Sequence, residues 1–155
     1  MKNKAAVSRI KLVACDFDGV MTDNTVIVDE NGKESVVCSR SDGLGIRILK
    51  EKGIEVIVIS KEKNKVVGAR CRKLDIPCTQ GADDKLEILK NEMEKRNLAP
   101  EEVCFVGNDI NDLQCIRHVV GIAVNDAFPE VRKFAKIITK KKGGEGVIRE
   151  IAGMM

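Results

Sequence analysis

Aromatic residues are scarce in this chain, which contains no tryptophan, no tyrosine and only four phenylalanines among its 155 residues. Nucleic-acid binding that depends on base stacking therefore has few side chains to use. The formal net charge is only +3. The basic run from Lys136 to Lys142 is interrupted by Ile137, Ile138 and Thr139. We interpret that run as a short strand followed by a solvated turn rather than a polyanion site, and expect no nucleic-acid partner.

Long apolar runs are also missing. No segment reaches the ~18 consecutive apolar residues of a membrane span, and the segment from Met1 to Val7 lacks the apolar stretch of a signal peptide. We therefore expect no membrane partner and a cytoplasmic location. With 155 residues, of which 43% are hydrophobic and 33% charged, residues 1–155 are expected to form one domain with a substantial core.

Metal-ligand spacing is absent from the six cysteines, because no two of them form a C-x-x-C pair and His118 is the only histidine. This pattern argues against a structural zinc site and against a disulfide framework. We expect reduced and mostly buried thiols, which stand at Cys15, Cys38, Cys71, Cys78, Cys104 and Cys115.

Short apolar strands alternate with amphipathic helices along the chain. This order predicts an α/β fold of the Rossmann-like type, with a parallel sheet that carries helices on both faces. The expected strands are Lys11–Cys15, Ile54–Ile59, Cys78–Thr79, Glu102–Val106, Ile122–Val124 and Ile137–Ile138. The expected helices are 41–52, 64–74, 84–96, 111–118, 130–134 and 146–152.

A β-hairpin is predicted between the first strand and the first helix. Thr25–Val28 and Glu34–Cys38 flank a turn sequence that contains Asn31-Gly32, a dipeptide favoured in hairpin turns. Ser41 or Asp42 is expected to cap the helix that follows.

The richest chemistry lies in Asp16-Phe17-Asp18-Gly19-Val20, directly after the first strand. Two carboxylates spaced i, i+2 at the carboxyl end of a buried strand can face the same pocket, and Gly19 lets the backbone approach a ligand closely. This suits Asp16 as a nucleophile and Asp18 as the residue that transfers a proton, with a divalent cation beside them.

Three further segments follow or lie just beyond later strand ends, and each suits phosphoryl transfer. The Ser60 hydroxyl can bind a phosphate oxygen, and Lys85 can neutralise the phosphate and the nucleophile. Asp109 can complete a Mg²⁺ site with Asp16, since that ion prefers hard oxygen ligands. Taken alone, the acids are also typical of turns and helix caps, Lys85 of a solvated helix and Ser60 of a turn, so the prediction depends on their combination in this order.

These four segments resemble the motifs of the haloacid dehalogenase superfamily of phosphatases. Asp16-Phe17-Asp18-Gly19-Val20, Ser60, Lys85 and the run from Gly107 to Asp112 match the first to fourth motifs, and the resemblance covers about 11–151. It implies an aspartyl-phosphate intermediate on Asp16. It also implies a Mg²⁺ site made by Asp16, the backbone carbonyl of Asp18, and Asp109, with phosphate bound by Gly19, Ser60 and Lys85. Asn108 stands where many relatives have a second acid, and we leave it out of the metal set.

The number of residues between the first and second motifs narrows the branch of this superfamily. Only the hairpin fits between Asp18 and Ser60, so the chain has no cap domain. It thus resembles the small capless phosphatases of phosphorylated 3-deoxy-2-keto sugar acids. That resemblance implies a homotetramer in which the hairpin forms the interface and a neighbouring copy completes the pocket. It also implies that the glycine-rich segment 142–150 folds toward the active site, although a plain turn before a terminal helix explains it as well.

Within this branch, Ser60-Lys61-Glu62-Lys63-Asn64 resembles the nonulosonate (sialic-acid-type) 9-phosphate phosphatases and the related C-terminal domain of acylneuraminate cytidylyltransferases. Glu62 would accept hydroxyls of the longer sugar, and Arg70 or Lys73 would bind its carboxylate. The alternative for these side chains is a solvated helix face. We therefore favour a nonulosonate 9-phosphate as substrate over 3-deoxy-D-manno-octulosonate 8-phosphate.

Two other classes of function stay open. A non-catalytic oligomerisation module would share the fold, but retention of Asp16, Asp18, Lys85 and Asp109 favours an enzyme. A phosphoacceptor domain of the response-regulator type would also carry an aspartate-centred site on a parallel sheet. Such a domain would accumulate aspartyl phosphate rather than turn it over.

Overall fold

The computed structural model describes residues 6–155, so most of the segment 1–7 discussed above lies outside the described residues. Six parallel strands form the central sheet in the order β5-β4-β1-β6-β7-β8. The predicted parallel sheet is confirmed. Its strands are β1 (Leu12–Cys15), β4 (Glu55–Ile59), β5 (Cys78–Thr79), β6 (Val103–Gly107), β7 (Val120–Ala123) and β8 (Ile137–Ile138).

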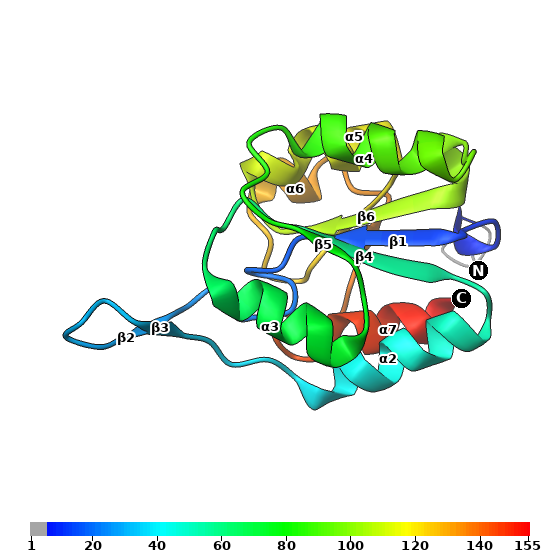
Figure 1. Ribbon diagram of the computed structural model, residues 1–155. Coiled ribbons are helices and arrows are strands. Elements are labelled where there is room, and N and C mark those ends of the chain that lie inside the picture. The colour runs from blue at the N-terminus through cyan, green and yellow to red at the C-terminus, as the bar shows by residue number, and fades with distance from the viewer. Residues whose placement is uncertain (1–5) are drawn as a thin grey trace.

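Helices cover both faces of this sheet (Figure 1). On one face lie α2 (Arg40–Glu51), α3 (Lys65–Leu74) and α7 (Val147–Met154). On the other lie α4 (Lys85–Lys95), α5 (Leu113–His118) and α6 (Pro129–Arg132). Two 3-10 turns, η1 (Pro100–Glu102) and η2 (Ile110–Asp112), adjoin β6 at its two ends. The central strands β1 and β6 are buried along their whole length, as expected for a sheet covered on both sides.

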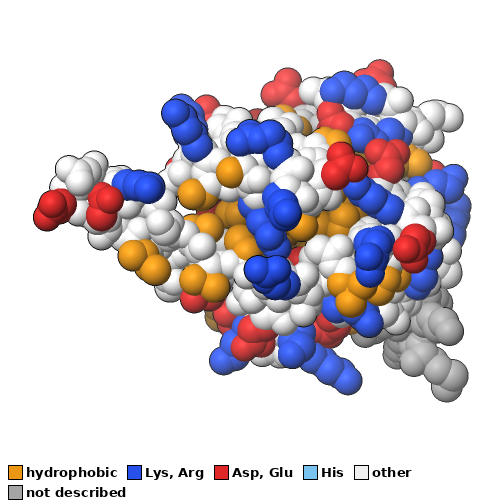
Figure 2. Space-filling view, turned by 60° about the horizontal axis from the view of Figure 1, so that its bottom comes forward, with side chains coloured by type: hydrophobic (Ala, Val, Ile, Leu, Met, Phe, Trp, Pro, Cys, Tyr) orange, Lys and Arg blue, Asp and Glu red, His pale blue; other side chains and the backbone are white. Residues whose placement is uncertain are grey.

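The hairpin is present but shorter than predicted. Its strands β2 (Ile27–Val28) and β3 (Glu34–Ser35) pair over two residues each, and the hairpin projects away from the body (Figure 1). Its apolar side chains are exposed, Ile27 by 65% and Val37 by 67%. Figure 2 shows hydrophobic side chains at the surface where the hairpin joins the body, next to lysine and arginine side chains. No cap domain lies between β1 and β4.

The predicted cap of α2 is wrong. Ser39 caps the helix by accepting a hydrogen bond from the Ser41 N–H, whereas we expected Ser41 or Asp42 in that role. Asp42 is instead fully buried, and its Oδ1 accepts a hydrogen bond of 2.9 Å from the N–H of Ile148 in the first turn of α7. This acid therefore joins two helices that lie far apart in the sequence, which local cap preferences do not reveal.

The six cysteines are free thiols, four of them buried, as expected. Ile137–Ile138 of the basic run form β8, and the residues after it turn toward α7. Among residues 6–155 we find no helix of the length and apolarity needed to cross a bilayer.

Candidate active site

A cavity of about 150 Å³ lies at the carboxyl ends of β1, β4 and β6. In a parallel sheet this is the edge where ligands bind. The loops after these three strands supply its walls. They are formed by Asp16, Asp18, Asn24, Ser60, Lys61, Glu62, Asn108, Asp109 and Asn111. The structure thus brings the residues of the first, second and fourth motifs to one place.

Lys85 of the third motif lies directly behind this cavity. Its Nζ is 2.9 Å from Asp16 Oδ1 and 2.8 Å from Asp112 Oδ1, and only 4% of the residue is exposed. Burial lowers the pKa of Lys85, but the Asp112 and Asp16 carboxylates outweigh that effect and raise its pKa above the usual value. The ammonium therefore stays charged and holds the two carboxylates in place.

Asp16 is itself nearly buried. Burial raises the pKa of the Asp16 carboxyl well above its usual value, and Asp112 adds to the shift while Lys85 opposes it. Its Oδ1 also accepts a 2.7 Å hydrogen bond from the Phe17 N–H. Among the described residues, none donates a hydrogen bond to its second oxygen, Oδ2. That oxygen is available to a phosphorus atom or a cation in the cavity.

Asp112 is a site residue that the sequence reasoning missed. It lies at the end of the fourth motif, and the sequence alone assigns it no role. The structure shows it fully buried, with Oδ1 on Lys85 and Oδ2 accepting hydrogen bonds from the N–H groups of Asn108 and Asp109. It therefore fixes the loop that carries Asp109. Its position three residues after Asp109 could have predicted this role, because a carboxylate there can accept a hydrogen bond from the N–H of the capping residue.

Asp18 and Gly19 start the turn that follows Asp16. Burial raises the pKa of the half-buried Asp18 above its usual value. Gly19 has a φ of +82°, and a Cβ there would lie 2.0 Å from Asn108 Nδ2. Only glycine fits this backbone and this contact. The Gly19 N–H, expected to face phosphate, donates to Thr22 Oγ1 at 3.2 Å.

Ser60 and Glu62 reach the cavity from the end of β4. Ser60 is buried, and its Oγ accepts a 3.1 Å hydrogen bond from the Glu62 N–H. Glu62 is exposed, and its Oε1 accepts hydrogen bonds from the N–H groups of Lys63 and Asn64. Its Oε2 has no partner among the described residues, so it remains able to accept a hydroxyl of a ligand.

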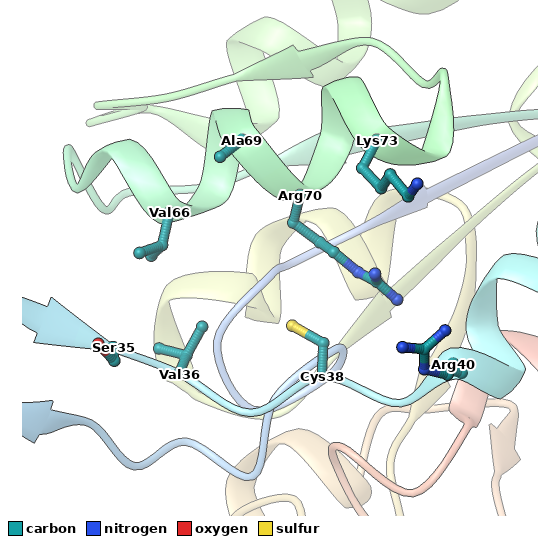
Figure 3. Close-up of a pocket in the computed structure, with 8 residues that line it drawn as sticks. All are labelled: Ser35, Val36, Cys38, Arg40, Val66, Ala69, Arg70 and Lys73. Atoms are coloured by element: carbon teal, nitrogen blue, oxygen red, sulfur yellow. The ribbon is translucent and has the colours of Figure 1, made fainter.

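Arg70 and Lys73 do not line this cavity. Both lie on α3 beside a second hollow of about 560 Å³ between that helix and the segment from the hairpin to α2. Figure 3 shows Arg70 extending toward Cys38 and Arg40, with Lys73 further along the helix. An Arg70 guanidinium nitrogen, Nη2, donates to the Ser39 carbonyl at 3.0 Å. Within one chain, therefore, these two cations line a different hollow from Asp16 and Asp18.

The residues around the cavity fit a magnesium ion. Its walls supply the carboxylates of Asp16 and Asp109, and the Asn108 side-chain oxygen is buried without a hydrogen-bond partner in the described part of the chain. Hard oxygen donors of this kind suit Mg²⁺. Across residues 6–155, no three histidine, cysteine, aspartate or glutamate side chains gather at a metal-binding distance. The expected set does not require three, because Asp18 would contribute its backbone carbonyl.

The glycine-rich segment packs against the turn that carries Asp18. The Gly144 N–H donates to the Val20 carbonyl at 3.0 Å, and the Gly143 N–H donates to Asp126 Oδ1 at 2.9 Å. A Cβ at Gly143 would lie 2.2 Å from the Gly19 carbonyl oxygen. The segment thus reaches the active-site turn within the same chain, although its residues do not line the cavity.

Residues 59–151 match the family model described as haloacid dehalogenase-like hydrolase. Among characterised proteins, the 3-deoxy-D-manno-octulosonate 8-phosphate phosphatase KdsC of Escherichia coli K12 is 35% identical over 97% of this chain and 81% of its own length.

Solved structures agree with this match. A HAD family hydrolase from Streptomyces avermitilis is 45% identical, with a TM-score of 0.93 over 96% of this chain and 86% of that one. The 3-deoxy-D-manno-octulosonate 8-phosphate phosphatase of Moraxella catarrhalis, in complex with magnesium, phosphate and the sugar acid, is 32% identical. Its TM-score is 0.92 over 97% of this chain and 87% of that one.

Proposed function

Since this chain belongs to the haloacid dehalogenase-like hydrolases, in the branch of magnesium-dependent sugar-acid phosphatases, we propose that it hydrolyses a phosphorylated 3-deoxy-2-keto sugar acid through an aspartyl phosphate on Asp16. The observation that carries the proposal is the meeting of Asp16, Asp18, Ser60 and Asp109 around one cavity, with Lys85 paired to Asp16 behind it.

In the first step, an oxygen of Asp16 bonds to phosphorus while the bond between phosphorus and the sugar oxygen breaks. Asp18 gives its proton to the departing sugar oxygen. In the second step, Asp18 takes a proton from water as the water oxygen bonds to phosphorus. The bond between phosphorus and Asp16 breaks, which releases inorganic phosphate and restores both carboxyl groups.

Ser60 would donate its hydroxyl to a phosphate oxygen, and Lys85 would hold Asp16 ionised and oriented. Asp16, the carbonyl of Asp18, and Asp109 would hold Mg²⁺, which supplies positive charge against the phosphate oxygens. The Gly19 N–H is bonded to Thr22 Oγ1, so Gly19 would serve phosphate binding through the close backbone approach that it permits and not through its amide.

For the sugar, we propose a nonulosonate 9-phosphate, with 3-deoxy-D-manno-octulosonate 8-phosphate as the second candidate. Glu62 lies in the cavity wall and keeps one carboxylate oxygen unpartnered among the described residues, which suits a sugar with an additional hydroxyl. The names of the relatives favour the eight-carbon substrate.

We further propose a homotetramer in which Arg70 and Lys73 of one copy bind the substrate carboxylate in the site of another. Both cations lie away from the cavity of their own chain, and the hairpin exposes apolar side chains that a neighbouring copy would cover, among them Val26, Ile27, Val28 and Val37. The cytoplasmic location expected from the sequence stays a prediction.

The experiment compares kcat/KM for octulosonate 8-phosphate and a nonulosonate 9-phosphate with Mg²⁺, for the wild type and the Glu62→Arg variant. We expect the wild type to prefer the nine-carbon substrate and the variant to shift toward the eight-carbon one. Glu51→Arg, at an exposed position in the last turn of α2, is the matched charge reversal and should leave the ratio unchanged.

An unchanged ratio in Glu62→Arg would remove the role of Glu62. A wild-type preference for octulosonate 8-phosphate would select the second candidate. Failure to hydrolyse either sugar phosphate would favour a non-catalytic module, while stable aspartyl phosphate without turnover would favour a phosphoacceptor domain. Light scattering after size-exclusion chromatography would test the tetramer.

A further inference from the structure

The hydroxyl group of Thr22 lies in the middle of the active-site turn. Thr22 is fully buried. Its Oγ1 lies 3.2 Å from the Gly19 N, 3.1 Å from the Asn24 N and 3.3 Å from Asp18 Oδ1. Three polar groups of one turn therefore converge on a single side-chain oxygen that has no access to solvent.

The donors and acceptors in this arrangement can be assigned from chemistry alone. A threonine hydroxyl has two lone pairs and one proton. The N–H groups of Gly19 and Asn24 can only donate, so they occupy both lone pairs. The single hydroxyl proton is then left for Asp18 Oδ1, which must accept it. Every hydrogen-bonding capacity of the Thr22 hydroxyl is used.

We propose that Thr22 is a positioning residue that fixes the Asp18 carboxyl with Oδ1 as a permanent acceptor, so that Oδ2 alone exchanges protons with the reacting groups. The inference rests on the phosphatase function proposed above. In the first step, Oδ2 gives its proton to the sugar oxygen as the phosphorus–oxygen bond breaks. In the second step, Oδ2 takes the proton of the attacking water while Oδ1 keeps its hydrogen bond to Thr22.

The surroundings of Thr22 keep this orientation fixed. The backbone of the turn packs against the glycine-rich segment, where a Cβ at Gly143 would lie 2.7 Å from the Thr22 carbonyl oxygen. The Gly144 N–H is bonded to the Val20 carbonyl in the same turn. The glycine-rich segment holds the backbone of the turn, and the Thr22 hydroxyl already makes three hydrogen bonds. The orientation of this side chain is therefore fixed.

The test separates proton transfer from folding by changing the leaving group. The Thr22→Val variant keeps the shape of the side chain but lacks the hydroxyl, and Thr22→Ser keeps the hydroxyl. The two substrates are p-nitrophenyl phosphate and whichever of the two sugar-acid phosphates the wild type hydrolyses faster. p-Nitrophenolate leaves without being protonated, whereas a sugar alkoxide requires the proton from Asp18.

Both substrates need Asp18 as a base in the second step, so the rate of leaving-group release is measured in a single turnover, which reports the first step alone. We expect Thr22→Val to lower this rate for the sugar-acid phosphate roughly 10- to 100-fold, as part of the contribution of general acid catalysis. Single-turnover release of p-nitrophenolate should stay within about threefold of the wild type, because no proton is needed at that leaving group. Thr22→Ser should restore the rate on the sugar substrate. The control is Thr25→Val, since Thr25 is exposed and its N–H and hydroxyl both donate to Asp23 Oδ1.

Equal losses on both substrates, or an undiminished rate on the sugar substrate in Thr22→Val, would overturn the inference. Removing the hydroxyl leaves the buried Gly19 N–H and the partly buried Asn24 N–H without this acceptor. If Thr22→Val does not fold, Thr22→Cys takes its place, because its thiol is only a weak donor and acceptor, and it should show the same selective loss. A wild type that hydrolyses p-nitrophenyl phosphate but neither sugar phosphate contradicts the proposed substrate and, with it, this inference. A wild type that hydrolyses a sugar phosphate while Thr22→Val loses both rates equally contradicts this inference alone.

Discussion

Replacing Lys85 with methionine should destabilise the protein more than any substitution of an exposed lysine. Methionine fills a similar volume with a flexible side chain, so the main loss is the charge. Lys85 Nζ lies 2.9 Å from Asp16 Oδ1 and 2.8 Å from Asp112 Oδ1, and the side chains of all three residues are almost completely buried. Without the ammonium, two buried carboxylates face each other. Removing one partner of a buried ion pair costs about 3–5 kcal/mol, and we expect a loss of that size here.

The assay is urea denaturation of the metal-free protein, with the free energy of unfolding extrapolated to water. Lys95→Met is the control, because the Lys95 side chain is 68% exposed in its ion pair with Glu92 and should contribute less than about 1 kcal/mol. Adding Asp112→Asn to Lys85→Met removes one of the opposed carboxylates. The double variant should therefore show a coupling of about 0.5–3 kcal/mol relative to the single variants.

A decrease of less than about 1 kcal/mol in the free energy of unfolding of Lys85→Met would refute this reasoning, since removing a buried cation leaves its two carboxylate partners unpaired. Additive effects of Lys85→Met and Asp112→Asn would likewise show that the two side chains do not interact as the structure places them.

Two further predictions concern Asp16 and Asp42. Asp16→Asn should lower kcat by more than about 10³-fold with little change in the thermal midpoint, and activity above a tenth of the wild type would contradict its role. Burial raises the pKa of Asp42 to about 6 from 3.8, so the folded state binds this proton more tightly than the unfolded state. Stability should therefore fall by up to about 3 kcal/mol as pH rises from about 4 to about 6, and Asp42→Asn should flatten that slope in urea denaturation; an unchanged slope would contradict the assignment.

The sequence was sufficient for the sheet and for the motif residues that follow its strands. Asp16, Ser60 and Asp109 follow strongly apolar segments, and the carboxyl ends of parallel strands must meet at one edge. The positions of these residues therefore follow from strand order alone. The same reasoning could not fix Ser39 as the helix cap, because Ser39, Ser41 and Asp42 all favour that position locally.

Contacts between segments that are distant in the chain could not be predicted from the sequence. Asp42 accepts a hydrogen bond from the N–H of Ile148 in α7, which lies 106 residues further along the chain. Arg70 and Lys73 lie on a face of α3 that turns away from the cavity of the same chain, and helical spacing cannot show which neighbour a face meets. The saturated hydroxyl of Thr22 depends on the backbone path of the turn, which no residue pattern specifies.

The central claim is that Asp16 accepts the phosphoryl group, and rapid acid quench during turnover of a sugar-acid phosphate tests it most directly. Reduction of the quenched protein with borohydride converts aspartyl phosphate into homoserine, which mass spectrometry of the tryptic peptide 12–33 can locate. We predict homoserine at position 16 during turnover and none without substrate. Phosphate release with unmodified Asp16 throughout turnover, or modification of another carboxylate instead, would contradict the account.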